Sequence, residues 1–243
     1  IEYPDLNLSY TLKVVPFGKS FKIIVDLDAP LPKEWVGKVG MNIELFPGIL
    51  FGKSYYMDDA FGIFHRQANG PGFYYMDNQY QLKPMAEGIG LVVAPECEKQ
   101  TLHIKSLKDN KLQLIDGRAR HNNGWFVVRS LVPGGVTKNE VEWLMTPEVV
   151  KDFIYDPVVQ VSQVGYHPNQ EKIAVIETDN NDTDTDKIKL FMLNNKGGQT
   201  EIMSENPKAW GQLVRYIYYK FDFSKIKEAG LYFITYKTIK SNP

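Results

Sequence analysis

The sequence predicts an all-β protein of two β-sandwich domains. Two features support this prediction. Apolar and polar residues alternate with a period of two in most segments, which is typical of strands buried on one face. Glycine and proline interrupt the chain at short intervals, as they do in loops between short strands. No long segment has the 3.6-residue period of a helix, although residues 139–153 have room for a helical turn or two.

Length and composition limit the classes of protein. The 243 residues exceed the ~100–200 that are usual for one domain, and 43% of them are apolar, enough for a packed core. The net charge of −1, with lysine and arginine scattered along the chain, gives no basic surface for nucleic acid or an anionic membrane. No apolar run approaches the ~20 residues of a membrane span. A single cysteine, Cys97, excludes an internal disulfide and leaves the compartment open.

The first domain is expected over residues 1–155, as a β-sandwich whose topology the sequence leaves open. Residues 10–14 and 21–25 alternate as half-buried strands do. The apolar segments 104–107 and 112–115 flank Asp109-Asn110, which favours a hairpin. A further strand is expected over residues 125–129, after the polar turn 121–124.

The second domain is expected over residues 156–243, after the boundary signal Tyr155-Asp156-Pro157. Several short strands separated by turns in under about ninety residues indicate an immunoglobulin-like sandwich. Tyr232 follows a turn at the start of a late strand, which suits a tyrosine corner; an ordinary cross-strand aromatic is the alternative. The strands are expected at residues 172–178, 187–193, 213–223 and 231–237.

Several motifs carry a resemblance to a known family. Gln163-Val164-Gly165-Tyr166-His167-Pro168, followed by a strand that opens on Lys172, resembles the entry to the immunoglobulin-like domain of family 9 glycoside hydrolases. Trp210-Gly211, Asp222-Phe223-Ser224 and Gly230-Leu231-Tyr232 extend the resemblance over residues 157–240. The upstream segments 42–48 and 122–126 resemble the extra N-terminal region of Bacteroidetes-type enzymes of that family.

The resemblance implies that the chain is the non-catalytic N-terminal portion of a secreted bacterial glycoside hydrolase that degrades β-glucans. In that family a catalytic (α/α)6 barrel follows, so the barrel is the expected partner, and the expected location is secreted, periplasmic or on the cell surface. No cofactor is implied. The family's Asp-Ala-Gly-Asp motif is not present in the chain. Asp58-Asp59 is the nearest imitation, but adjacent residues of a strand point to opposite faces, so loop capping or surface charge is favoured.

The acidic stretch 179–186 has the oxygen ligands that calcium prefers, but it lacks the glycine and glutamate of an EF-hand loop. A solvated loop between strands is the favoured interpretation. The four histidines are far apart in the sequence and lack the spacing of a zinc site. We therefore expect no metal site.

Carbohydrate binding is the remaining function to weigh. Pyranose rings present apolar C–H faces that stack on aromatic rings, while amides and charged groups bond their hydroxyls. Two clusters combine such residues: Trp125 with Asn122 and Asn123, and a second group formed by Tyr55, Tyr56, Arg66, Tyr74 and Tyr75. The alternatives are core or cross-strand aromatics, and contacts with the expected barrel. A self-sufficient carbohydrate-binding module is thus the alternative function.

Overall fold

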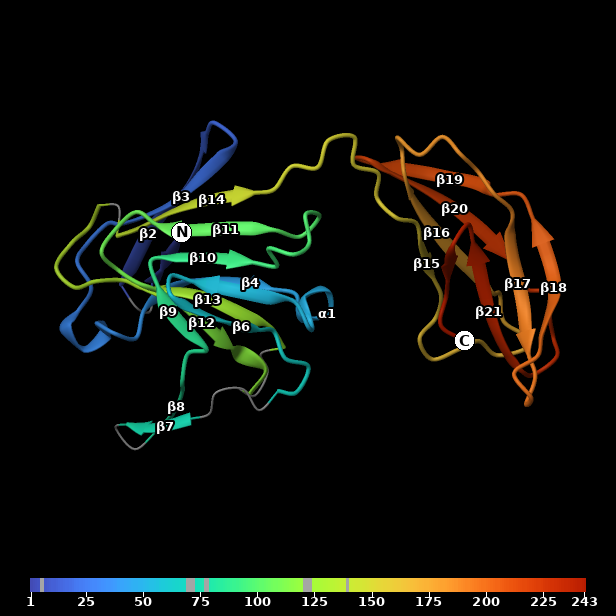
Figure 1. Ribbon diagram of the computed structural model, residues 1–243, viewed down its shortest axis with the longest axis horizontal. Helices are drawn as coiled ribbons and strands as arrows, with labels where there is room; N and C mark the ends of the chain where they lie inside the picture. Colours follow the sequence, from blue (N-terminus) through green and yellow to red (C-terminus); the bar gives the residue numbers. More distant parts are fainter. Residues whose placement is uncertain (5–6, 69–72, 77–78, 120–123, 139) are drawn as a thin grey trace. The chain divides into compact units, whose positions relative to one another are not determined.

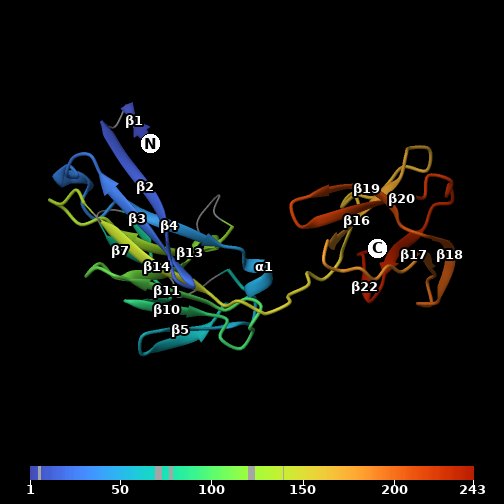
Figure 2. The same cartoon turned by 90° about the horizontal axis from the view of Figure 1, so that it is seen from above.

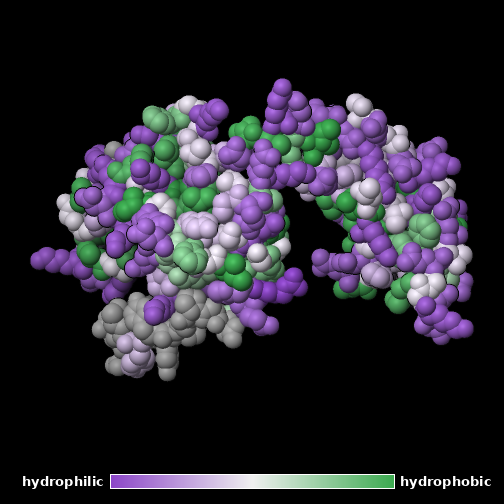
Figure 3. All heavy atoms as spheres, viewed as in Figure 1, coloured by the Kyte–Doolittle hydropathy of each residue, from purple (hydrophilic) through white to green (hydrophobic). Residues whose placement is uncertain are grey.

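The computed structural model describes residues 1–4, 7–68, 73–76, 79–119, 124–138 and 140–243. The chain forms two compact units, residues 1–150 and 151–243, and each is built from antiparallel strands (Figure 1). The predicted all-β class is confirmed, with sandwich architecture in both units. On the face of each unit seen in Figure 3, hydrophobic and hydrophilic residues are interspersed. Within the described ranges, no helix has the length and apolar character that a membrane crossing requires.

The first unit contains an eight-stranded and a four-stranded sheet, with the pair β7 (Phe73–Met76) and β8 (Gln79–Leu82) beside them. In spatial order the large sheet consists of β1 (Glu2–Tyr3), β2 (Leu8–Phe17), β3 (Ser20–Leu27), β14 (Val141–Pro147), β11 (Leu102–Ser106), β10 (Gly90–Val93), β5 (Ser54–Met57) and β6 (Ala60–Ile63). The small sheet consists of β4 (Gly40–Leu45), β13 (Phe126–Leu131), β12 (Leu112–Asp116) and β9 (Ala86–Gly88). The short helix α1 (Pro47–Leu50) follows β4 (Figure 2), and two 3₁₀ helices span Lys33–Trp35 and Gly117–Ala119.

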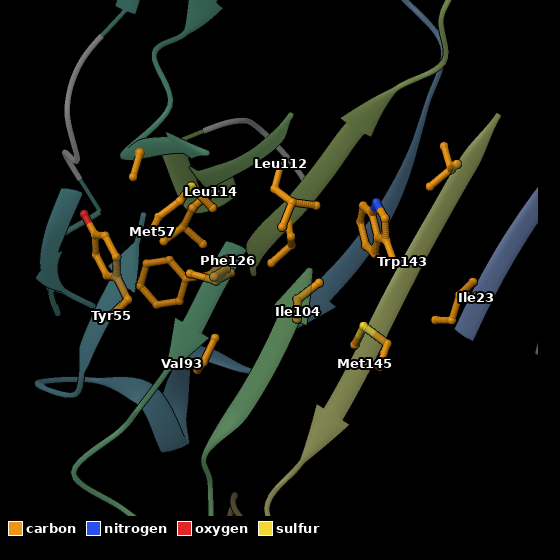
Figure 4. Packing of buried hydrophobic residues seen from close by; sticks show 14 of the residues in the cluster. Ile23, Tyr55, Met57, Val93, Ile104, Leu112, Leu114, Phe126, Trp143 and Met145 are labelled. Atoms are coloured by element: carbon orange, nitrogen blue, oxygen red, sulfur yellow. The ribbon is translucent and has the colours of Figure 1, made fainter. Parts of the chain in front are cut away.

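The core of the first unit lies between the two sheets (Figure 4). The alternating residues of β14 place Trp143 there with no exposed surface, and its indole nitrogen donates to Ser130 Oγ at 3.1 Å. Ile104 from the large sheet and Leu114 and Phe126 from the small one complete the contact. Burial of this alternating apolar face is what holds the sheets together.

Two expectations for this unit are wrong. Residues 104–107 and 112–115 do not form a hairpin, because β11 and β12 belong to different sheets. The loop between them crosses the sandwich, and the Asn110 amide fastens it by donating to Glu140 O at 3.1 Å. Instead of the helical turns considered for residues 139–153, the described segment from Val141 to Pro147 is strand β14, whose period of two decides in favour of a strand.

The second unit is a sandwich of two four-stranded sheets. The first has the order β15 (Val158–Gln160), β16 (Ile173–Asp179), β20 (Tyr216–Asp222) and β19 (Lys208–Leu213). The second has the order β18 (Gln199–Glu205), β17 (Ile188–Leu193), β21 (Leu231–Tyr236) and β22 (Ile239–Lys240). Ile176, Leu190, Phe221 and Tyr236 are buried between them.

The Val-Gly-Tyr entry motif has a structural task in this unit. The Tyr166 hydroxyl accepts a hydrogen bond from Ser162 N at 2.9 Å and donates to Ile173 O at 3.0 Å, while its ring packs edge-on against Phe223 at 5.2 Å. The buried Lys172 amine donates to Pro168 O at 2.7 Å, and burial lowers its pKa. These bonds fix the turn against the first strand of the sandwich.

Tyr232 has the geometry of a tyrosine corner. It is the second residue of β21, and its hydroxyl donates to Glu228 O, four residues upstream, at 3.1 Å. The expected corner is therefore confirmed as a hydrogen bond across the turn that precedes the strand.

Candidate carbohydrate-binding site

The first predicted cluster centres on an exposed aromatic pair. Phe126 pairs with Leu45 across β13 and β4, so the residues flanking this pair, Trp125 and Phe46, lie side by side. Their ring centroids are 5.4 Å apart with the planes tilted by 55°. Trp125 is 37% exposed and Phe46 54%, so the alternative of a core tryptophan does not hold for Trp125. We refer to these two residues as the Phe46–Trp125 platform.

Arg118 fastens the neighbouring loop to this end of the small sheet. Its guanidinium makes two 2.8 Å bonds to the buried Asp116 carboxylate and donates to His65 O at 2.6 Å and Arg66 O at 3.1 Å. It also lies over the Phe126 ring, 4.4 Å from the centroid. Because these partners occupy the guanidinium, Arg118 acts as a structural clasp.

The clasp places Arg66 at the same end of the sheet as Trp125. Arg66 is exposed and lies over the ring of Phe51, 5.7 Å from its centroid, and Phe51 packs edge-on against Phe126. An exposed guanidinium at this end of the sheet can donate hydrogen bonds to a hydroxyl-rich ligand. Asn122 and Asn123, which the prediction added to this cluster, lie outside the described residues.

The tyrosines of the second cluster do not form one surface. Tyr55 is buried and packs edge-on against Phe64 at 5.3 Å, which removes it from the expected binding surface. Its neighbour Tyr56 points to the opposite face, is 51% exposed, and contacts Phe61 across the strand pair at 6.0 Å. The alternation of side chains along β5 explains why two adjacent tyrosines differ so completely.

The other two predicted tyrosines lie in β7. Tyr75 is exposed and pairs with Tyr80 of β8. Tyr74 belongs to the same strand, but its side chain is outside the described part of the structure. The structure therefore places Trp125 and the backbone of Arg66 at one end of the small sheet, and Tyr56 on the large sheet.

Sequence reasoning missed Phe46 as the partner of Trp125. The two residues are 79 positions apart and meet only through the β4–β13 register. The available signal was an aromatic residue directly after the alternating segment 42–45, but without the register it identifies no partner.

Three of the carboxylates considered for catalysis or metal binding, Asp58, Asp179 and Asp182, have structural partners. Asp58 accepts hydrogen bonds from Ile89 N at 2.7 Å and Gly90 N at 2.9 Å, the loop-capping role favoured above. In the acidic stretch, Asp179 bonds Arg215, and Asp182 bonds the Lys237 amine at 2.6 and 2.7 Å. These contacts tie the loop to the sandwich.

The second unit is an immunoglobulin-like β-sandwich, as its strand order and tyrosine corner show. The hydrogen-bonded turn at Tyr166 is consistent with this class. Comparison with protein families matches residues 155–241 to the cellulase N-terminal Ig-like domain. The match supports a cellulase-associated, non-catalytic N-terminal domain in this part of the chain. Comparisons with curated proteins and with solved structures gave no match.

Proposed function

We propose that this chain is the non-catalytic N-terminal portion of a secreted bacterial glycoside hydrolase of the family 9 type, which degrades β-glucans. Its task is to support a catalytic (α/α)6 domain that follows in the full protein. The observation that carries the proposal is the match of residues 155–241 to the cellulase N-terminal Ig-like domain. Within this segment, Tyr166 of the entry motif and Tyr232 of the tyrosine corner both form their hydrogen bonds.

Location outside the cytoplasm is part of the proposal. A β-glucan polymer does not cross a bacterial membrane intact, so an enzyme that attacks it must be secreted, periplasmic or on the cell surface. The first unit, whose upstream segments resemble the extra region of Bacteroidetes-type enzymes, would extend the support given by the second.

The reading frame that follows the codon for Pro243 in the gene tests this proposal. We expect several hundred residues with helical periodicity, an Asp-Ala-Gly-Asp motif for the general base and a late glutamate for the general acid. The two carboxyl groups of an inverting enzyme must lie ~6.5–9.5 Å apart to admit the attacking water. A frame that encodes a different fold would contradict the proposal.

One observation favours a second function, that of a carbohydrate-binding module acting through the first unit. The Phe46–Trp125 platform exposes aromatic surface, as a sugar-stacking site requires, at the end of the small sheet where Arg118 also holds the backbone of Arg66. Affinity electrophoresis of the chain and its Trp125→Ala variant in gels containing soluble β-glucan tests this function. Retardation that the variant loses supports it, and equal migration with and without glucan rejects it.

A further inference from the structure

The outer face of the sheet β15-β16-β20-β19 carries a row of aromatic side chains. In β20, Tyr219 and Phe221 face the core, so Tyr216 and Tyr218 point outward. Trp210 sits at a β-bulge in β19, beside the pairing of Gly211 with Tyr218. We call Trp210, Tyr218, Tyr216 and Tyr155 the β20 row.

Ring contacts hold this row in place. Trp210 is 60% exposed, yet its ring meets Tyr218 edge-on at 6.4 Å with an interplanar angle of 78°. At the other end, Tyr155 meets Tyr216 edge-on at 5.3 Å and 73°. These ring contacts fix the side chains before a ligand binds, so binding costs little conformational entropy. The rings are therefore preorganised for a ligand.

Charged side chains of both signs lie along the row. The Lys220 ammonium is 4.3 Å from the centroid of the Trp210 ring. Glu177 pairs with Tyr218 in the sheet, and a hydrogen bond between their side chains raises the pKa of the Tyr218 hydroxyl. The row therefore offers aromatic surface with a donor and an acceptor close by, although the Lys220 ammonium covers one face of the Trp210 ring.

We infer that the β20 row binds a neutral oligosaccharide, with a pyranose ring stacked on the face of Trp210 that Lys220 leaves open and its hydroxyls bonded by Glu177 and Lys220. A pyranose combines an apolar C–H face with a rim of hydroxyl groups, and this is the pattern that the row complements. Stable protein interfaces deplete charged residues at their centre, whereas Glu177 and Lys220 stand within the row. The inference goes beyond the proposed function, because it holds whether or not a catalytic domain follows.

The test measures retardation of the chain by soluble neutral glycans: hydroxyethylcellulose, xyloglucan, mixed-linkage β-glucan and galactomannan. We expect at least one of them to retard the chain, and Trp210→Ala to weaken that binding by about tenfold, the equivalent of one good aromatic contact. Trp210→Phe keeps a ring and should retain part of the affinity. Glu177→Gln should weaken binding without removing the stacking surface.

Phe17→Ala is the matched control. Phe17 is also an exposed aromatic residue, at 57%, with a lysine, Lys22, over its ring at 5.0 Å, but it lies in β2 of the first unit. The control should bind like the wild type. Thermal melts of the Trp210 and Phe17 variants should coincide with that of the wild type, because both rings are largely exposed.

Three results would overturn the inference. The first is the absence of retardation by any of the four glycans. The second is retardation that survives Trp210→Ala, including the case in which Trp125→Ala abolishes it. The third is a dimer in sedimentation velocity that Trp210→Ala dissociates, since the row would then join two copies of the chain.

Discussion

The guanidinium of Arg215 bonds the buried carboxylate of Asp179 and so fastens the segment before β15 to the rest of the second unit. The same guanidinium donates to Phe153 O at 3.1 Å, and Tyr155 N donates to Asp179 at 2.9 Å. Segment 153–155 is therefore attached at two backbone positions. These hydrogen bonds hold residues 153–155 in place, and the family match begins at residue 155.

Asp179→Asn should destabilise the second unit at neutral pH and flatten its response to acid. Hydrogen bonds from Asn181 N and Tyr155 N, together with Arg215, lower the pKa of the Asp179 carboxyl. The stability that this group contributes is present above the unfolded-state pKa of about 3.9 and is lost as the pH falls through the lower folded-state value. Urea unfolding between pH 7 and pH 2 measures it. Parallel pH curves for wild type and variant would contradict the assignment.

Glu140→Gln should have the opposite effect in the first unit. Burial, and then the neighbouring Asp26 charge, raise the pKa of the Glu140 carboxyl, against the weaker influence of Lys108. Neither carboxylate oxygen has a hydrogen-bond partner in the part of the chain that the structure describes. Wild-type stability should fall as the pH rises from about 4.3 through the raised folded-state value, because the charged form is disfavoured.

The glutamine variant should therefore unfold at a higher temperature than the wild type at pH 7, with the difference vanishing in acid. Glu142→Gln, two residues further along the chain, is the matched control, since Glu142 forms an ion pair with Lys22 at 2.9 Å and its loss should not stabilise. A wild-type melting temperature that exceeds that of Glu140→Gln at pH 7 would refute this account.

The two tryptophans of the first unit should respond differently to truncation. Trp143→Ala empties a fully buried site and should cost roughly 3–5 kcal/mol of unfolding free energy. Trp125→Ala removes a ring that is already partly in water, so about 1–2 kcal/mol is expected. Denaturant melts of both variants test this order, and equal losses would show that Trp125 is packed as a core residue.

Several strand positions of the second unit followed from the sequence, because one face of each strand is buried. β16, β17 and β21 lie within a residue of the strands expected there, whereas β14 was not expected, although its apolar residues Trp143 and Met145 alternate with half-buried neighbours. The alternation of apolar and polar residues does not specify which strands pair with one another. The sequence around Asn110 suits both a hairpin turn and a loop that crosses between sheets. The strands with which β11 and β12 pair determine which of the two forms.

The candidate site was harder to predict for the same reason. Tyr55 and Tyr56 are equally plausible binding residues from the sequence alone. Only the orientation of β5 in the sheet determines that Tyr55 is buried and Tyr56 is exposed. The Phe46–Trp125 contact and the β20 row arise from cross-strand register, which one sequence does not specify. The entry motif was predictable because its residues are close in the chain and bond one another directly.

Tyr232→Phe should destabilise the second unit by about 0.5–1.5 kcal/mol, the usual net contribution of one hydrogen bond. The substitution keeps the ring and removes only the hydroxyl that bonds Glu228 O. Chemical denaturation monitored by circular dichroism gives the free-energy difference. An unchanged unfolding midpoint would mean that the corner does not contribute to stability.

The most direct test of the central claim, that this chain supports a catalytic domain without being one, compares three proteins: the chain alone, the downstream domain alone, and the two joined as in the gene. Reducing-sugar release from mixed-linkage β-glucan and the melting temperature of the downstream domain are measured for each. The account predicts no release by the chain, and a higher melting temperature and greater activity for the joined protein than for the downstream domain alone. Sugar release by the chain alone, or a downstream domain equally stable and active without it, would contradict the account.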